Sequence, residues 1–198
     1  MRWAGLYLRS RHVPAALVMA IGGVVLMWSL WSIFSNSRDV GLPMVILTVL
    51  VVVAALTTTL GGPDTALELT GSLPVFLRRA AHLLVAFLVV VLPLLITLAT
   101  EARFGPAGLV VRDAAGLLGL TALGAAAIGP ARAWFLPLGW TLAAVMFPHA
   151  EPLLGRVLTW PAQAPESTAA AVTAGVLAAA GLIAYAVAGP AKRAAADR

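Results

Sequence analysis

The sequence predicts an all-α, polytopic membrane protein with six transmembrane helices in a single transmembrane domain, residues 1–198. Of its residues, 61% are hydrophobic and 11% are charged, and the mean hydropathy is +0.98. Soluble domains contain about 45–50% apolar and about 25% charged residues, so this composition excludes an ordinary soluble protein. Apolar segments also recur at close to the ~20 residues that cross a ~30 Å hydrocarbon core. Together these two observations indicate the fold class.

The six predicted spans are separated by short connections that contain most of the charged residues. The fifth span is the shortest and directly follows a tight turn at 129–132. The expected spans are 14–34, 42–60, 81–100, 107–128, 133–147 and 167–188.

Residues 1–12 are predicted to form a helix that lies in the membrane interface. Trp3, Leu6 and Tyr7 share one helical face, and three arginines accompany them. A secretory signal peptide is the competing interpretation, because a basic start precedes an apolar run. That run is too long for a signal peptide, and no small-residue cleavage site follows it.

The distribution of arginine and lysine predicts that both termini are cytoplasmic. With the N-terminus inside, four basic residues face outside, namely Arg38, Arg103, Arg112 and Arg156. The cytoplasmic side then holds Arg2, Arg9, Arg11, Arg78, Arg79, Arg132, Lys192, Arg193 and Arg198. This excess agrees with the positive-inside rule, and an even number of spans returns the C-terminus to the same side. Because nearly all basic residues are arginine, as in high-GC genomes, we expect a bacterial inner or plasma membrane.

The polar connection 61–80 is predicted to be a cytoplasmic loop that carries a short helix. Pro63 and Asp64 suit a first helical turn, where proline is tolerated and acidic side chains favour the helix dipole. Asp64 and Glu68 then share one face, where paired carboxylates could perform acid–base chemistry or bind a metal. The loop has no histidine and no third ligand, so a solvated start of a helix is the favoured interpretation.

The connection 148–166 is predicted to be an outer hairpin. Five apolar residues of Pro152–Trp160 are mixed with Arg156, Glu151 comes directly before this stretch and Pro161 follows it. This pattern predicts a short amphipathic helix that dips into the outer leaflet and ends at Pro161.

No motif indicates an enzyme. The chain lacks HExxH, GxxxxGK[ST] and GxSxG, and it has no cysteine. His12, His82 and His149 lie far apart in sequence, and the latter two are expected to be interfacial anchors or hydrogen-bonding groups. No cofactor or metal is expected in this chain. No basic cluster with interleaved aromatic residues supports binding of nucleic acid.

Charged residues within the predicted spans are confined to Arg112 and Asp113. They lie near the start of the fourth span, where an arginine can reach the headgroups if that end is close to the interface. We therefore expect no charge buried in the membrane, which disfavours coupling to an ion gradient. A transport process would then take its energy from a partner protein.

Tryptophans near predicted span ends, including Trp160, are typical of an interfacial belt. The candidates for lining a substrate path are Trp28, Trp31, Trp140 and Met146. Small residues at four-residue spacing also mark the fourth and sixth spans. These residues, which predict close helix packing within the chain rather than a dimer face, are Ala115, Gly119, Ala171, Gly175 and Ala179.

The layout of spans and the local sequence TALELTGSLPVFLRRAAHLL resemble the permease subunits of type-2 ATP-binding-cassette exporters. In that family a Glu-Leu pair opens a short coupling helix, and a proline and basic residues precede the third span. The matching residues are Glu68, Leu69, Pro74, Arg78 and Arg79.

The resemblance implies a transporter subunit that couples ATP hydrolysis in a separate nucleotide-binding ATPase to export of a lipid, peptide or antibiotic. ATP and Mg would bind to that ATPase, and a second permease copy or homologue would complete the assembly in the lipid membrane. The implied ATPase interface comprises Asp64, Glu68, Leu69, Pro74, Arg78 and Arg79. The alternatives are a non-transporting scaffold or accessory subunit, and an intramembrane enzyme that acts on lipid with Asp64, Glu68 and His82 around a metal.

Overall fold

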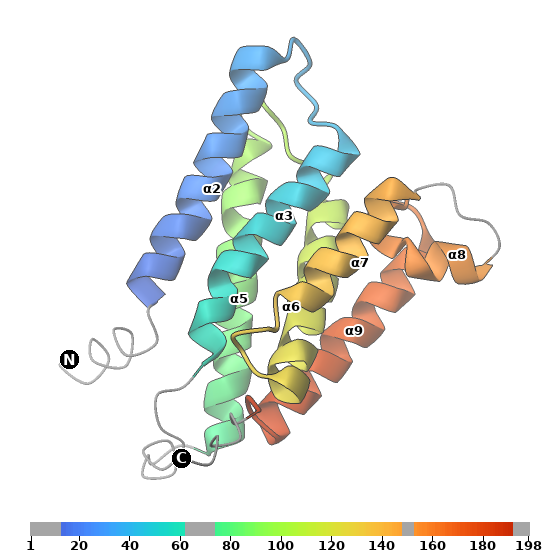
Figure 1. The fold of residues 1–198 in the computed structure, drawn as a ribbon. Helices are drawn as coiled ribbons and strands as arrows, with labels where there is room; N and C mark the ends of the chain where they lie inside the picture. Colours follow the sequence, from blue (N-terminus) through green and yellow to red (C-terminus); the bar gives the residue numbers. More distant parts are fainter. Residues whose placement is uncertain (1–12, 62–73, 148–152, 192–198) are drawn as a thin grey trace.

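The computed structural model describes residues 13–61, 74–147 and 153–191. Their regular secondary structure is helical, and the helices form one bundle of up-and-down elements (Figure 1). In chain order the helices are α2 (Val13–Phe34), α3 (Leu42–Thr57), η1 (Thr58–Leu60), α5 (Val75–Thr97), α6 (Ala107–Ile128), α7 (Phe135–Met146), α8 (Leu153–Leu158), η2 (Trp160–Ala162) and α9 (Thr168–Val187).

Five helical segments are long and apolar enough to cross a membrane. They are Val13–Phe34, Leu42–Leu60, Val75–Thr97, Ala107–Ile128 and Thr168–Val187. By length and composition the chain is therefore a multi-pass membrane protein, which confirms the predicted fold class at this level. The predicted interfacial helix 1–12 lies outside the described residues.

α7 is shorter than the predicted fifth span, 133–147. It covers Phe135–Met146, which is 12 residues. At ~1.5 Å per residue it rises only about 18 Å, against a hydrocarbon core of ~30 Å. Residues 130–134 form a turn that shortens the helix at its start. At its end Phe147 precedes Pro148, and a residue before proline is disfavoured in the helical region.

α5 begins at Val75 and not at 81, where the apolar run of the third span starts. Pro74 is its N-cap residue, and the Pro74 carbonyl accepts a hydrogen bond from the N–H of Leu77 at 3.1 Å. Arg78 and Arg79 therefore belong to the helix and not to the preceding connection. The difference arises because hydrophobicity marks where a helix enters the hydrocarbon, whereas the backbone becomes helical before that point.

α6 is the central helix of the bundle. In its apolar segment 78% of the residues are buried, against 17% for α2 at the periphery. α6 contacts α3, α5, α7 and α9, and its contact with α9 is the most extensive. The rest of the bundle is arranged around this helix pair.

Glycine permits α6 and α9 to approach at backbone distance. A Cβ added to Gly181 of α9 would collide with the backbone of Gly119 in α6. One added to Gly119 would collide with the backbone of Leu177 and Ala178. Small residues at a crossing point allow such packing in membranes. Gly119 thus packs within the chain, as its spacing from Ala115 predicts.

The predicted packing stripe on α9 faces outward instead of inward. Ala171, Gly175 and Ala179 are exposed, so they do not contribute to the contact with α6. The inward face is formed by other small residues, Ala170, Ala174 and Gly181. Because α9 carries small residues on several faces, their spacing alone does not identify the packed one.

At one end of the bundle the connection from α2 to α3 pairs with the connection from α5 to α6 (Figure 1). The N–H of Val40 donates to the Arg103 carbonyl at 3.0 Å, and the N–H of Arg103 donates to the Arg38 carbonyl at 2.7 Å. Arg38 also forms an exposed ion pair with Glu101 at 3.0 Å. These bonds align the ends of four helices.

We expect Gly181→Ala to destabilise the protein, because its methyl group would force α6 and α9 apart. Overpacking of this kind typically costs about 1–3 kcal/mol. The matched control is Gly175→Ala on the same helix, where no atom lies within 4 Å of the new Cβ. The measurement is the free energy of unfolding in detergent micelles. Equal effects of the two substitutions would contradict the proposed α6–α9 contact.

Candidate functional site

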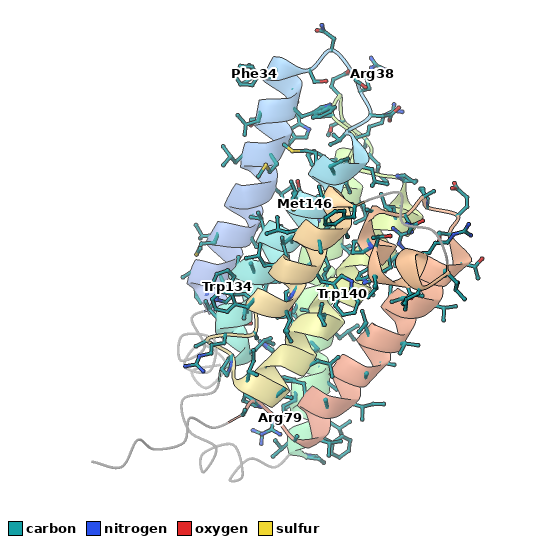
Figure 2. All side chains as sticks on the ribbon, turned by 45° about the vertical axis from the view of Figure 1, so that its right-hand side comes forward. Phe34, Arg38, Arg79, Trp134, Trp140 and Met146 are labelled. Atoms are coloured by element: carbon teal, nitrogen blue, oxygen red, sulfur yellow. The ribbon has the colours of Figure 1, made fainter. Side chains whose placement is uncertain are left out.

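The predicted ATPase interface lies in the connection between η1 and α5 and in the first turns of α5. Asp64, Glu68 and Leu69 fall outside the described residues. Pro74 is exposed at the start of α5, and Arg78 and Arg79 are half-buried in the turns that follow. Figure 2 shows Arg79 at the opposite end of the bundle from Phe34 and Arg38.

The residues directly before this connection are bonded to α5 and α9. The hydroxyl of Tyr185, a fully buried residue of α9, donates to the Leu60 carbonyl at 2.8 Å. The Thr59 hydroxyl lies 3.0 Å from Nε2 of His82 in α5. His82 is thus a hydrogen-bonding group, as expected from the sequence. The chain therefore enters the connection from a fixed position.

The chain that follows the connection is also fixed to α9. Arg79 packs against Gly189, just after α9, so closely that a Cβ on Gly189 would collide with the guanidinium. Gly189 has φ 74, which glycine adopts without steric cost. The N–H of Ala191 then donates to the Ala125 carbonyl of α6 at 2.8 Å. Both ends of the connection are therefore joined to the same part of the bundle.

A second polar cluster, which the sequence did not reveal, surrounds Arg112 in α6. Nε of Arg112 donates to Oδ1 of Asp113 at 2.9 Å. Its Nη1 donates to the Ala164 carbonyl at 2.9 Å, and its Nη2 donates to the Gln163 carbonyl at 3.0 Å. A longer contact of 3.4 Å joins Nη2 to the Pro161 carbonyl. One guanidinium thus holds the irregular segment between η2 and α9.

The expectation that no charge is buried within a span is wrong. The side chains of Arg112 and Asp113 are 6% and 0% exposed. The irregular segment after η2 lies against Arg112, and its carbonyls accept hydrogen bonds that water would otherwise accept. The Arg-Asp pair inside an apolar run was the available signal. Asp113 Oδ2 has no hydrogen-bond partner among the described residues.

The outer hairpin is inserted into the bundle more deeply than predicted. α8 (Leu153–Leu158) has exposed apolar side chains, as a short amphipathic helix requires. Pro161 does not end the helical structure, because η2 contains it. Trp160 is fully buried against Gly116 of α6, where a Cβ would lie 2.9 Å from two of its ring carbons. Trp160 is therefore a core residue and not part of an interfacial belt.

The four candidates for a substrate path lie on two helices, Trp28 and Trp31 one turn apart on α2 and Trp140 and Met146 on α7. Nε1 of Trp28 donates to the Thr100 hydroxyl at 2.9 Å, which joins α2 to the end of α5. Nε1 of Trp31 donates to the Ser37 carbonyl at 2.8 Å. Nε1 of Trp140 donates to the Leu158 carbonyl at 2.6 Å, which joins α7 to α8. The remaining candidate, Met146, is largely exposed.

A cavity of about 550 Å³ lies between α5, α6 and α9, and its lining side chains are apolar. None of the four path candidates lines it. In the part of the chain that the structure describes, no three His, Asp or Glu side chains are placed to hold a metal ion.

Comparisons with protein-family models, with curated proteins and with solved structures find no match to this chain. A functional assignment therefore rests on the geometry of the chain and on the resemblance noted in its sequence.

We expect Arg112→Gln to destabilise the protein strongly. The substitution leaves Asp113 as an uncompensated buried charge and removes donors from backbone carbonyls, and breaking a buried pair typically costs about 3–5 kcal/mol. Arg112→Lys should recover only part of this loss, because an ammonium group lacks the planar fork. The measurement is the free energy of unfolding in detergent.

The matched control for Arg112 is Arg38→Gln. Arg38 is also paired with a carboxylate, but both side chains are exposed. Exposed pairs typically contribute about 0–1 kcal/mol, so a small effect is expected. A loss at Arg38 as large as that at Arg112 would contradict the structural role of the buried cluster.

We expect Tyr185→Phe to loosen the chain just before the connection, because the buried Leu60 carbonyl would lose its donor. A buried acceptor without a partner typically costs about 1–3 kcal/mol. Amide hydrogen exchange in η1 should rise, and the free energy of unfolding should fall. Ser32→Ala is the control, since its hydroxyl bond to the Trp28 carbonyl is exposed. Unchanged exchange in η1 would contradict the anchoring role of Tyr185.

Proposed function

We propose that this chain is the membrane-spanning subunit of an ATP-binding-cassette exporter. In this proposal a separate nucleotide-binding subunit hydrolyses ATP, and the chain couples that hydrolysis to export of a hydrophobic or amphipathic molecule. The observation that carries the proposal is the anchoring of both ends of the connection between η1 and α5. Leu60 is bonded to Tyr185, and Arg79 packs on Gly189.

Anchored ends would transmit a displacement of the connection into the bundle. A partner that pushes on residues 61–74 acts on η1 through one end and on α5 through Pro74 at the other. Because Tyr185 and Gly189 join both ends to α9, three helical elements would respond together. Such rigid elements can change packing as units, whereas a loosely tethered loop would absorb the motion.

The charge distribution supports a cytoplasmic partner at this end. Arg78, Arg79 and Arg132 lie here, on the side that the positive-inside rule assigns to the cytoplasm, where ATP is available. The carboxylates of Asp64 and Glu68 would add polar contacts on the connection itself. An ATPase surface that combines acidic and basic groups would suit this arrangement.

The hydrogen bonds of the buried Arg112 guanidinium support a transport process whose energy comes from a partner protein and not from an ion gradient. Transport driven by an ion gradient requires a buried group that is available to the ion. The Arg112 guanidinium is engaged with Asp113 and with carbonyls of the irregular segment after η2. These bonds favour a structural role over a coupling role for Arg112, whereas Oδ2 of Asp113 has no hydrogen-bond partner among the described residues.

The test is recovery of an ATPase with the chain. We expect the full chain, purified in mild detergent with the products of adjacent genes, to retain a nucleotide-binding subunit. Glu68→Ala and the double substitution of Arg78 and Arg79 to Ala should each weaken that complex by at least about tenfold, or 1.4 kcal/mol. They should also reduce the dependence of ATP hydrolysis on the chain.

Matched controls at the other end of the bundle are Glu101→Ala and Arg38→Ala, which should leave the complex intact. These residues are paired and exposed, so their replacement tests charge alone. Recovery of no nucleotide-binding subunit, or equal effects at both ends, would refute the proposal.

A non-transporting scaffold is the second candidate. The indole groups of Trp28, Trp31 and Trp140 favour it, because each is hydrogen-bonded within the bundle and none lines the apolar cavity. A scaffold would bind its partner without changing the rate of ATP hydrolysis. The same purified complex therefore distinguishes the two candidates.

A further inference from the structure

Buried polar atoms of α6, α7 and η2 lack a hydrogen-bond partner in the part of the chain that the structure describes. They are Oδ2 of Asp113, Oγ1 of Thr141 and Nε1 of Trp160. Each of these residues is 0% exposed. A buried polar group without a hydrogen bond destabilises a fold, so native proteins satisfy nearly all such groups with protein atoms or with ordered water.

The elements that carry these atoms pack on one another. Asp113 and Gly116 share one face of α6, and the Trp160 ring covers Gly116 so closely that a Cβ there would lie 2.9 Å from two ring carbons. α7 contacts both α6 and η2 (Figure 1). Trp140, which directly precedes Thr141 in α7, donates from Nε1 to the carbonyl of the last residue of α8 at 2.6 Å. All three atoms therefore belong to the contact between α6, α7 and η2.

The depth of this contact excludes bulk solvent as the partner. Residues Ala107 to Gly116 rise about 14 Å at ~1.5 Å per residue, which is nearly half of a ~30 Å hydrocarbon core. Polar groups at that depth must be satisfied inside the protein, because lipid tails offer neither donors nor acceptors. A ligand held between the three elements would satisfy them.

The chemistry of the three groups selects a small neutral ligand that both donates and accepts. A carboxylate accepts, an indole N–H only donates, and a hydroxyl does either. A cation does not fit, because the Arg112 guanidinium already balances Asp113 and the indole N–H would repel a second positive charge. An anion does not fit either, because it would face the carboxylate.

We infer that a water molecule is bound at this contact as part of the fold. It donates to Oδ2 of Asp113, accepts from Nε1 of Trp160 and shares a hydrogen bond with the Thr141 hydroxyl. Buried waters typically make about three hydrogen bonds to groups that would otherwise be unsatisfied. The water thus joins η2 to α6 and α7, next to the bonds by which Arg112 holds the segment after η2. The site lies within the chain and does not depend on the proposed ATPase partner.

The first test is the sign of the stability change in Thr141→Val, measured as the equilibrium constant of unfolding of the full chain in detergent micelles. If the hydroxyl binds the water, its removal should raise this constant about fivefold, as for the loss of one hydrogen bond. If the hydroxyl has no partner, valine replaces an unsatisfied polar group by an apolar group of the same shape. The constant should then fall.

A double-mutant cycle tests whether Thr141 and Trp160 share the ligand. In a Trp160→Phe background the indole N–H is absent, so the effect of Thr141→Val should fall from about fivefold to about twofold or less. The matched control is Thr121→Val, which removes an equally buried hydroxyl that donates to the Leu117 carbonyl at 2.8 Å. Its effect should be the same in both backgrounds.

A crystal structure of the unmodified chain, at a resolution that shows ordered water, tests the site without any substitution. We expect one density peak at about 2.7–3.2 Å from Oδ2 of Asp113 and from Nε1 of Trp160. Three results would overturn the inference: stabilisation by Thr141→Val, additive effects in the cycle, and no water between these ordered side chains. Each measurement uses the chain by itself, so failure here leaves the ATPase proposal unaffected. Conversely, absence of an ATPase would leave the water site unaffected.

Discussion

The arrangement of the bundle depends on the hydrogen bonds that Arg112 donates to backbone carbonyls of the segment after α8. A chain surrounded by apolar helices must pair its carbonyls internally, because neither lipid nor an apolar core supplies donors. The Arg112 guanidinium donates to the carbonyls of Pro161, Gln163 and Ala164, and the Ala164 carbonyl also accepts from the N–H of Ser167. Asp113 balances the charge. The hairpin can therefore enter the bundle, and Trp160 reaches Gly116.

Glycine has a comparable role further along the same face of α6. Gly119 and Gly181 bring α6 and α9 to backbone contact, so these two helices form a rigid centre. α6 thus packs on Trp160 through Gly116 and on α9 through Gly119. Side chains of larger size at either glycine would separate the elements. Lateral surfaces, including most of α2 and one face of α9, are left with exposed apolar residues.

The end of the bundle that carries Arg78 and Arg79 combines two properties that bear on function. Leu60, Tyr185 and Gly189 hold the ends of the connection in place, whereas the adjacent groove between α5 and α9 remains open. A partner acting on the connection would act on the start of α5.

The sequence by itself determined which segments are apolar helices, because hydrophobic length is a local property. The predicted spans 14–34 and 107–128 correspond to Val13–Phe34 and Ala107–Ile128. The tertiary structure alone decided which face of each helix is packed. A helix that is apolar on all sides carries no periodic signal for its inward face. Hence Gly181 rather than Gly175 contacts α6, and Arg112 is buried, because a distant segment supplies its partners.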